Sequence, residues 1–123
     1  MAIEPVKEFF RTVGREEDIL EFEISSATVD LAAKAAGVEG ARIAKTLSFR
    51  DGENAMLIVT AGDAKLYNRK FKQQFGFKAR MLKADEVIEQ TGHAIGGVCP
   101  FGLKNDIPVF LDVSMKRFES VFP

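Results

Sequence analysis

The chain has 123 residues, of which 46% are hydrophobic and 28% charged, and its net charge is −1. This length favours one domain over residues 1–123, with a core rich in phenylalanine because there are eleven Phe and no Trp. One Cys and one His exclude an internal disulfide and a zinc cluster. The lack of a secretory signal or of an apolar run long enough to cross a bilayer predicts a cytoplasmic protein.

Three elements are predicted before residue 40. Apolar residues spaced as on one helical face predict a helix over 3–13 that ends at a glycine. Residues 19–24 alternate in part between apolar and polar and predict a strand. A second helix runs over 28–36, because the Thr28 side chain can accept a bond from an early free N–H and Gly37 can end the helix.

Residues 43–60 predict a β-hairpin. The segment 43–49 is mostly apolar, Asp51-Gly52 forms a favourable turn, and 55–60 returns as a second strand.

The second half of the chain continues with short elements. Asn68 is predicted to cap a basic helix that Gly76 ends, and a strand at 79–82 and a helix at 85–90 follow. Residues 93–102 are too rich in Gly and Pro for regular structure and predict a shaped loop.

The C-terminal part is predicted to hold a strand at 107–111, placed near a sheet edge by Pro108, and a helical segment at 115–122. Strands and helices are interspersed and include one hairpin. The expected architecture is therefore a mixed sheet flanked by helices.

Charge is unevenly distributed along the chain. The overall balance argues against a protein that coats nucleic acid through its global field. Residues 65–83, however, hold seven basic side chains and no acidic one. This block is typical either of a patch that meets phosphates or of a solvated helix face. Its members are Lys65, Arg69, Lys70, Lys72, Lys78, Arg80 and Lys83.

Lys45 lies in a largely apolar predicted strand. A lysine with such neighbours risks losing its hydration unless a carboxylate, phosphate or carbonyl compensates. It is therefore either a lysine on the solvent face of the strand or a cation at a cleft that binds a phosphate or polarises an ester.

The segment Gly96–Gly102 is a second candidate. Glycines permit positive φ and close approach to the main chain, and successive N–H groups in such a loop can converge on a developing oxyanion. A purely structural turn is the alternative. The segment matches neither phosphate-binding nor dinucleotide-binding glycine patterns.

Cys99 and His93 invite a thiol-hydrolase interpretation, in which His93 serves as the base. Single cysteines are commonly buried small hydrophobic residues, and His93 fits a loop or surface residue. Ser25 and Ser26 lack an acyl-enzyme context and are assigned to the turn before the helix at Thr28.

The segments 28–33, 43–49 and 92–102 together resemble the YbaK family, the free-standing relatives of the editing (insertion) domain of bacterial prolyl-tRNA synthetase. Lys45-Thr-Leu after an apolar pair, followed by Gly96-x-x-x-Pro100, carries the resemblance, which runs from about residue 19 to the end. It implies a mixed α/β fold with a curved, partly barrel-like sheet. It also implies an aminoacyl-tRNA deacylase that acts in trans on mischarged tRNA, with a small amino acid on tRNA-Pro or a related tRNA.

The resemblance also implies the site residues. Lys45 would hold the terminal adenosine's phosphate or help place the ester, and the loop N–H groups would receive the ester carbonyl. The catalytic set is then Lys45, Gly96, Gly97, Val98, Cys99 and Pro100, and the substrate-binding set is Thr46, Phe101, Gly102, Lys65, Arg69 and Lys70. No metal, cofactor or protein nucleophile is expected, because water or a ribose hydroxyl is activated within the substrate.

The implied partner is the 3′ acceptor end of aminoacyl-tRNA, with a transient association with a synthetase and no membrane; the oligomeric state is left open. The family often carries serine where Cys99 stands, and its members continue with another strand and helix beyond the position of Pro123. Either the domain is short or its C-terminal end is incomplete. A non-catalytic module that binds tRNA or a nucleotide is the rival interpretation.

Overall fold

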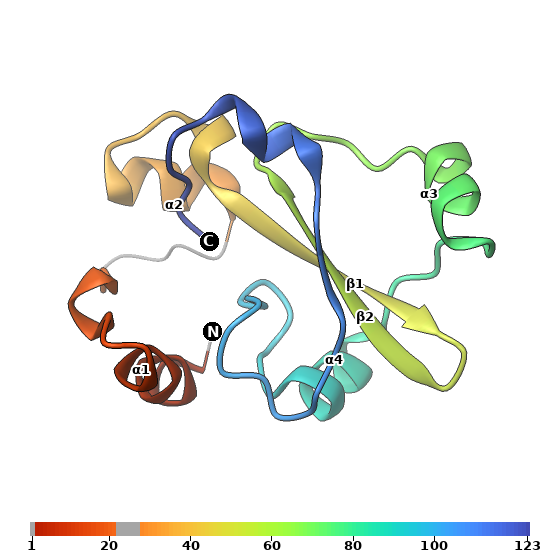
Figure 1. The fold of residues 1–123 in the computed structure, drawn as a ribbon, viewed down its shortest axis with the longest axis horizontal. Helices are drawn as coiled ribbons and strands as arrows, with labels where there is room; N and C mark the ends of the chain where they lie inside the picture. Colours follow the sequence, from red (N-terminus) through yellow and green to blue (C-terminus); the bar gives the residue numbers. More distant parts are fainter. Residues whose placement is uncertain (1, 22–27) are drawn as a thin grey trace.

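The computed structural model describes residues 2–21 and 28–123, which form a three-stranded mixed sheet with helices around it (Figure 1). Strands β1 (Ala44–Asp51) and β2 (Asn54–Ala61) form an antiparallel hairpin, and β3 (Val109–Leu111) pairs with β2 in parallel. The hairpin turns at Gly52, whose φ of 64° suits glycine. The predicted hairpin is confirmed.

Single bridges extend the sheet beyond the outer edge of β1. Met81 bridges to Phe49, and Phe122 bridges to Ile43. The predicted strand at 79–82 is therefore reduced to one residue, because the chain starts a helix directly afterwards. These bridges cover both ends of the β1 edge, and the predicted mixed α/β fold with a partly closed sheet is confirmed.

The predicted helical segment at 115–122 is wrong in extent. A 3₁₀ helix, η3 (Val113–Arg117), ends before Phe118. The chain then extends, because the backbone of Phe122 donates to the Arg42 carbonyl and accepts from Ala44 N–H, both at 2.8 Å. A long-range pairing has outweighed the local helical spacing.

Strand β2 is buried on both faces and organises the core. Ala55 and Leu57 pack with Leu82, Val87 and Ile107 on one face. On the other face, Met56 and Ile58 pack with Phe49 and Phe71. The predicted phenylalanine-rich core is present on this second face, where three phenylalanine rings pack around Phe71 in tilted and edge-on contacts.

Four helices surround the sheet: α1 (Ile3–Thr12), α2 (Val29–Ala36), α3 (Asn68–Phe75) and α4 (Ala84–Thr91). The predicted cap of α2 is confirmed, because Thr28 Oγ1 accepts from Leu31 N–H at 3.1 Å. The predicted cap at Asn68 is wrong. Tyr67 holds the cap position without a side-chain bond, and Asn68 is the first helical residue.

The predicted strand at 19–24 falls largely outside the described residues. Its described part, 19–21, has no strand structure and follows a 3₁₀ turn, Glu16–Asp18. Residues 22–24, together with Ser25 and Ser26, lie outside the described residues. Within 2–21 and 28–123, no helix combines the length and the apolar character that crossing a membrane requires.

The residue after β2 is a glycine for a steric reason. A Cβ atom on Gly62 would lie 2.1 Å from the Gly40 carbonyl oxygen and 2.8 Å from that of Ile43. Gly62 therefore lets the chain leaving β2 pass close to the segment that enters β1.

We expect Gly62→Ala to lower the free energy of unfolding by about 3 kcal/mol, because backbone atoms would have to move to admit the methyl group. Gly40→Ala is the matched control, since its Cβ would meet only Val29 Cγ1 at 3.6 Å. This control should cost less than about 1 kcal/mol. Urea denaturation measures both, and equal midpoints would contradict the steric explanation.

Candidate functional site

A cavity of about 1230 Å³ lies between the N-terminal part of the chain and the sheet. Among the described residues, its walls come from α1, α2, β1, the C-terminal residues 121–123 and the loop 94–101. The cavity touches the consecutive residues 43–48, so it runs along the edge of β1 rather than over one face of the sheet.

The loop begins with a tight turn. Gly97 N–H donates to the Ala94 carbonyl at 2.9 Å, and Gly96 has a φ of 85°. No non-glycine residue among those described has positive φ, so only the third residue of the turn does, which is the type II pattern. The glycine at 96 is therefore required by the turn. Figure 1 shows this loop, in light blue, between α1 and the sheet.

Six amides of this loop have no hydrogen-bond partner within residues 2–21 and 28–123, and all six residues line the cavity. They are the N–H groups of Ala94, Ile95, Gly96, Val98, Cys99 and Phe101. Val98 is half-buried and Cys99 is buried, whereas Gly96 is exposed. Amides withdrawn from water are normally paired, so the free N–H groups of Val98 and Cys99 can receive a ligand oxygen. Gly97 N–H is already used in the turn, although Gly97 lines the cavity too.

Lys45 also lines the cavity, opposite Thr60 in the β-ladder. Its ammonium group donates to the Ala64 carbonyl, in the turn that follows β2. An ammonium has three N–H donors, so this bond leaves two for an anionic or ester oxygen. Lys45 and the loop residues 94–99 thus border one cavity.

His93 is fully buried and holds the base of the loop. Its Nδ1 accepts from Ala2 N–H at 2.9 Å, which places the ring proton on Nε2. Nε2 then donates to the Phe101 carbonyl at 2.9 Å. Thr91 Oγ1 accepts from His93 N–H at 3.0 Å, and this bond ties the residue to the end of α4. His93 lies in a loop, as predicted, but it is buried and not at the surface.

Cys99 Sγ lies 3.6 Å from His93 Nε2 and donates to the same Phe101 carbonyl at 3.3 Å. The two side chains are adjacent, as a thiol hydrolase would need. However, Nε2 carries a proton that is directed at Phe101, so it cannot take the thiol proton. Burial raises the pKa of the Cys99 thiol, which is the opposite of activation.

Helix α1 closes over the loop. Phe10 packs edge-on against Phe101, with ring centroids 4.9 Å apart, and Phe9 stacks on Phe101 at 5.6 Å. A Cβ on Gly102, whose φ is 62°, would lie 2.6 Å from backbone atoms of Pro5 and Val6. Gly102 thus allows the close approach of α1 to the loop.

The remaining predicted residues divide between the cavity and the rest of the surface. Thr46 and Phe101 line the cavity. Five others do not: Pro100, Gly102, Lys65, Arg69 and Lys70. Arg69 and Lys70 lie on α3, at the opposite end of the molecule from α1 and α2 (Figure 1).

Several contributions to the cavity were not predicted from the sequence, including residues 18–21 and 121–123. Ser48 lines it on the same strand face as Thr46, and the alternation within the predicted strand could have indicated this. Ile3, Val6 and Phe10 of α1 line it as well. Nothing in the sequence pattern distinguished this apolar face from an ordinary core-facing helix.

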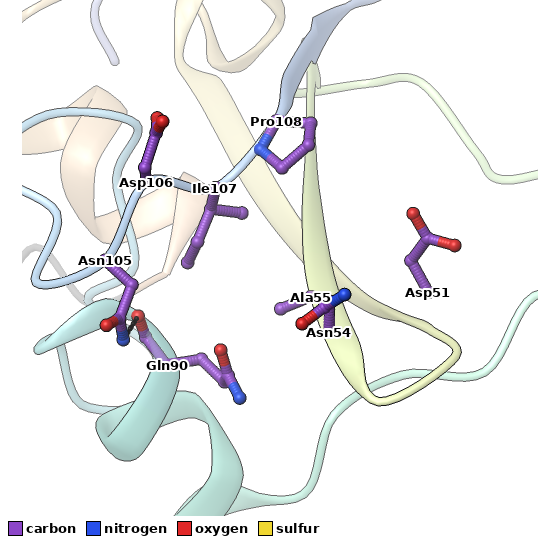
Figure 2. Close-up of a pocket in the computed structure, with 8 residues that line it drawn as sticks. All are labelled: Asp51, Asn54, Ala55, Gln90, Asn105, Asp106, Ile107 and Pro108. Carbon is purple, nitrogen blue, oxygen red and sulfur yellow. Dashed lines mark hydrogen bonds between the residues drawn. The ribbon is translucent and has the colours of Figure 1, made fainter.

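A second cavity, of about 430 Å³, lies between the hairpin end and α4 (Figure 2). Asn105 Nδ2 donates there to the Gln90 carbonyl at 2.8 Å, which caps α4. Asp51 and Asp106 lie on opposite sides of this cavity in Figure 2. Neither carboxylate has an ion-pair partner among the described residues, whereas Asp18 and Glu21 of the larger cavity are paired with basic side chains, so this second cavity is the less suitable one for a phosphate. No cluster of metal-ligating side chains is found in the described part of the chain.

Comparisons with known proteins identify the family and the fold. A family model described as the aminoacyl-tRNA editing domain matches residues 25–123. The uncharacterized protein YwhH of Bacillus subtilis (strain 168) is 60% identical over 124 residues, which span all of this chain and 79% of that protein.

Solved structures agree as well. The structure of a candidate trans-editing enzyme for prolyl tRNA synthetase superposes with a TM-score of 0.85 and 32% identity, over 95% of this chain and 75% of that one. The hypothetical protein APE2540 superposes with a TM-score of 0.83 and 30% identity, over 96% and 79% of the two chains.

The raised pKa of the Cys99 thiol predicts slow alkylation. At pH 7.5 we expect iodoacetamide to modify native Cys99 about tenfold more slowly than the urea-unfolded protein, because the reactive thiolate is scarcer in the buried site. The rate should still be rising with pH where an ordinary thiol has levelled off. Mass spectrometry over time measures it, and a native rate above the unfolded rate would indicate an activated thiol.

Proposed function

This chain belongs to the aminoacyl-tRNA editing domain family, as its sequence resemblance predicted, and from this membership we propose that it deacylates mischarged aminoacyl-tRNA in trans. The observation that carries the proposal is the shared cavity, whose walls include Lys45 and loop residues with unpaired amides, among them Gly96, Val98 and Cys99. We propose further that residues 1–123 act as one editing domain.

The loop amides are suited to the charge that develops in ester hydrolysis. Attack on the ester carbonyl places negative charge on its oxygen, and fixed N–H donors stabilise that charge without having to reorganise. Gly96, Val98 and Cys99 offer such donors from a turn that is held by His93 and α1. One donor of this kind contributes about 10²–10³ in rate in known hydrolases.

Lys45 supplies the positive charge. Its two remaining N–H donors can bind a phosphate of the terminal adenosine or the ester itself. The ammonium is half-buried beside apolar strand neighbours, where an ion pair is screened less than at an open surface.

The attacking group is a water molecule, which a hydroxyl of the terminal ribose holds and activates; the water oxygen adds to the carbonyl carbon, and its proton passes to the departing ribose oxygen. The ester bond between the amino-acid carbonyl and the ribose oxygen breaks, the amino acid leaves as a carboxylate and the tRNA regains its hydroxyl. Cys99 is not the nucleophile in this proposal, because its thiol is buried and His93 Nε2 already donates elsewhere.

The substrate is a small amino acid on tRNA-Pro or a related tRNA. This assignment is supported by the similarity to a candidate trans-editing enzyme for prolyl tRNA synthetase. The cavity wall near the loop is apolar, with Val98, Val6 and Phe10 among its residues. Such a pocket discriminates only modestly between side chains that differ by a methylene group.

A non-catalytic tRNA-binding module remains the alternative, since it would use the same cavity and the same lysine. Turnover separates the two functions, because a binding module would protect the ester from spontaneous hydrolysis rather than accelerate it. A thiol hydrolase would instead be inactivated by alkylation and by Cys99→Ser.

Lys45→Ala should lower kcat/KM for deacylation by about one to two orders of magnitude, because the cation facing the substrate is lost. The measurement is release of each amino acid from a panel of mischarged tRNAs by the purified protein. Lys34→Ala, an exposed lysine of α2 outside the cavity wall, is the matched control and should be unchanged. The midpoint of thermal unfolding should be nearly the same for the wild type, Lys45→Ala and Lys34→Ala. Wild-type rates in Lys45→Ala would refute the assigned site.

The basic block should contact the acceptor stem. Its α3 part presents Arg69 and Lys70 beside the exposed ring of Tyr67, with Lys70 Nζ 5.2 Å from the ring centroid. The double variant Arg69→Ala/Lys70→Ala should raise KM with little change in kcat, and reduce the slope of log KM against log salt by about two. An unchanged KM would contradict the contact with the acceptor stem and would identify this basic block as a solvated helix face.

A further inference from the structure

We propose that Arg117 is a positioning residue for Lys45. Arg117 pairs with the Asp63 carboxylate, and the Lys45 ammonium therefore stays available to the substrate. This inference rests on the proposed function and concerns the same site. It derives from the turn after β2, where the two charged side chains and the bonded end of Lys45 come together.

The contact between Arg117 and Asp63 is bidentate. Arg117 Nη2 lies 2.5 Å from Asp63 Oδ1, and Nη1 donates to Oδ2 at 3.0 Å. Both carboxylate oxygens are thus engaged by one planar guanidinium, which is the geometry that arginine and carboxylate favour.

The guanidinium is itself held in place. Arg117 Nε donates to the Ser114 carbonyl at 2.9 Å, and the group lies over the Phe118 ring, 4.8 Å from its centroid. Its orientation toward Asp63 therefore does not depend on the ion pair alone.

The segment that carries Arg117 is fixed to the end of β2. Ser114 Oγ accepts from Ala61 N–H at 3.0 Å, and Asp112 caps η3 by accepting from Ser114 N–H at 3.0 Å. Asp112 N–H in turn donates to the Val59 carbonyl at 2.9 Å. Since Ala61 directly precedes Gly62 and Asp63, the arginine and its partner are attached to the same strand end.

Lys45 reaches this turn from the neighbouring strand. Its ammonium donates to the carbonyl of Ala64, the residue after Asp63. Arg117 above all, and Lys45 to a smaller degree, hold the pKa of the Asp63 carboxyl below its ordinary value, so that the group is ionised at neutral pH. An ionised carboxylate beside a lysine is a competing partner for that lysine.

Among the described residues, Arg117 and Lys45 are the cations that lower the pKa of Asp63, so without Arg117 the carboxylate would be left with Lys45. Pairing with Asp63 would then oppose transfer of the ammonium to a substrate phosphate or ester. The Arg117–Asp63 pair is half exposed, so its contribution to folding stability is small and its main effect is on the charge that Lys45 meets.

A double-mutant cycle tests the inference. Arg117→Ala should lower kcat/KM for deacylation about tenfold, Asp63→Asn should stay near wild type, and Arg117→Ala/Asp63→Asn should return to within about twofold of wild type. Arg50→Ala is the control. It removes another surface ion pair, between Arg50 at the far end of β1 and Glu86 of α4, and its kcat/KM should equal that of the wild type.

A second readout does not depend on activity. Lys45 acetylation by a limiting acylating reagent, quantified by peptide mass spectrometry, should be about threefold slower in Arg117→Ala, because an ammonium paired with Asp63 gives up its proton less readily. The double variant should recover the wild-type rate.

The outcomes separate the inference from the proposed function. An unaffected Arg117→Ala, or a double variant as impaired as Arg117→Ala alone, would overturn the positioning role, the latter by revealing a structural one. If the wild type releases no amino acid from any tRNA, the proposed function fails. The acetylation rates alone then decide whether Arg117 keeps Asp63 from Lys45.

Discussion

The burial of β2 on both faces is the constraint on which the rest of the structure depends. Every residue from Ala55 to Ala61 is withdrawn from solvent, so one sheet face must be covered by α4 and the loop that follows it, and the other by α3 and its phenylalanines. Val98 of the loop packs directly on the first of these clusters. The amides beside it are thereby held at the wall of the larger cavity.

Within this frame, the site relies on main-chain groups held by buried polar contacts. His93 joins the start of α1 to the Phe101 carbonyl, and the Cys99 thiol donates to the same oxygen. The distance between Cys99 and His93 resembles that of a catalytic pair. Both groups, however, donate to the Phe101 carbonyl, so these bonds hold the loop in place. In the proposed function, the chemistry left to the protein is the placement of N–H donors and of one ammonium, which suits a reaction whose attacking group is water.

Charge is divided between two ends of the molecule. The basic helix α3 lies at the end away from α1 and α2, whereas the cavity lies beside those helices (Figure 1). A ligand that meets both must be long, as an acceptor stem is, with its 3′ end in the cavity. Near the cavity, acidic and basic side chains are paired with each other, as in Arg117 with Asp63, and this pairing leaves Lys45 as the cation available to an anionic ligand.

The sequence by itself determined the local elements and the chemical candidates. The spacing of apolar residues, the Thr28 cap and the turn at Gly52 specify helices and a hairpin through contacts a few residues apart, and Lys45 and Gly96–Pro100 stood out by residue type. Contacts between distant segments were decided only by the tertiary structure. Because of such contacts, Phe122 forms a bridge with Ile43 instead of continuing the predicted helix at 115–122, and Ser48 and α1 lie at the cavity. They also set the direction of the His93 bonds and the meeting of Arg117 with Asp63, because such pairings depend on which surfaces must be buried together, and no local pattern records that.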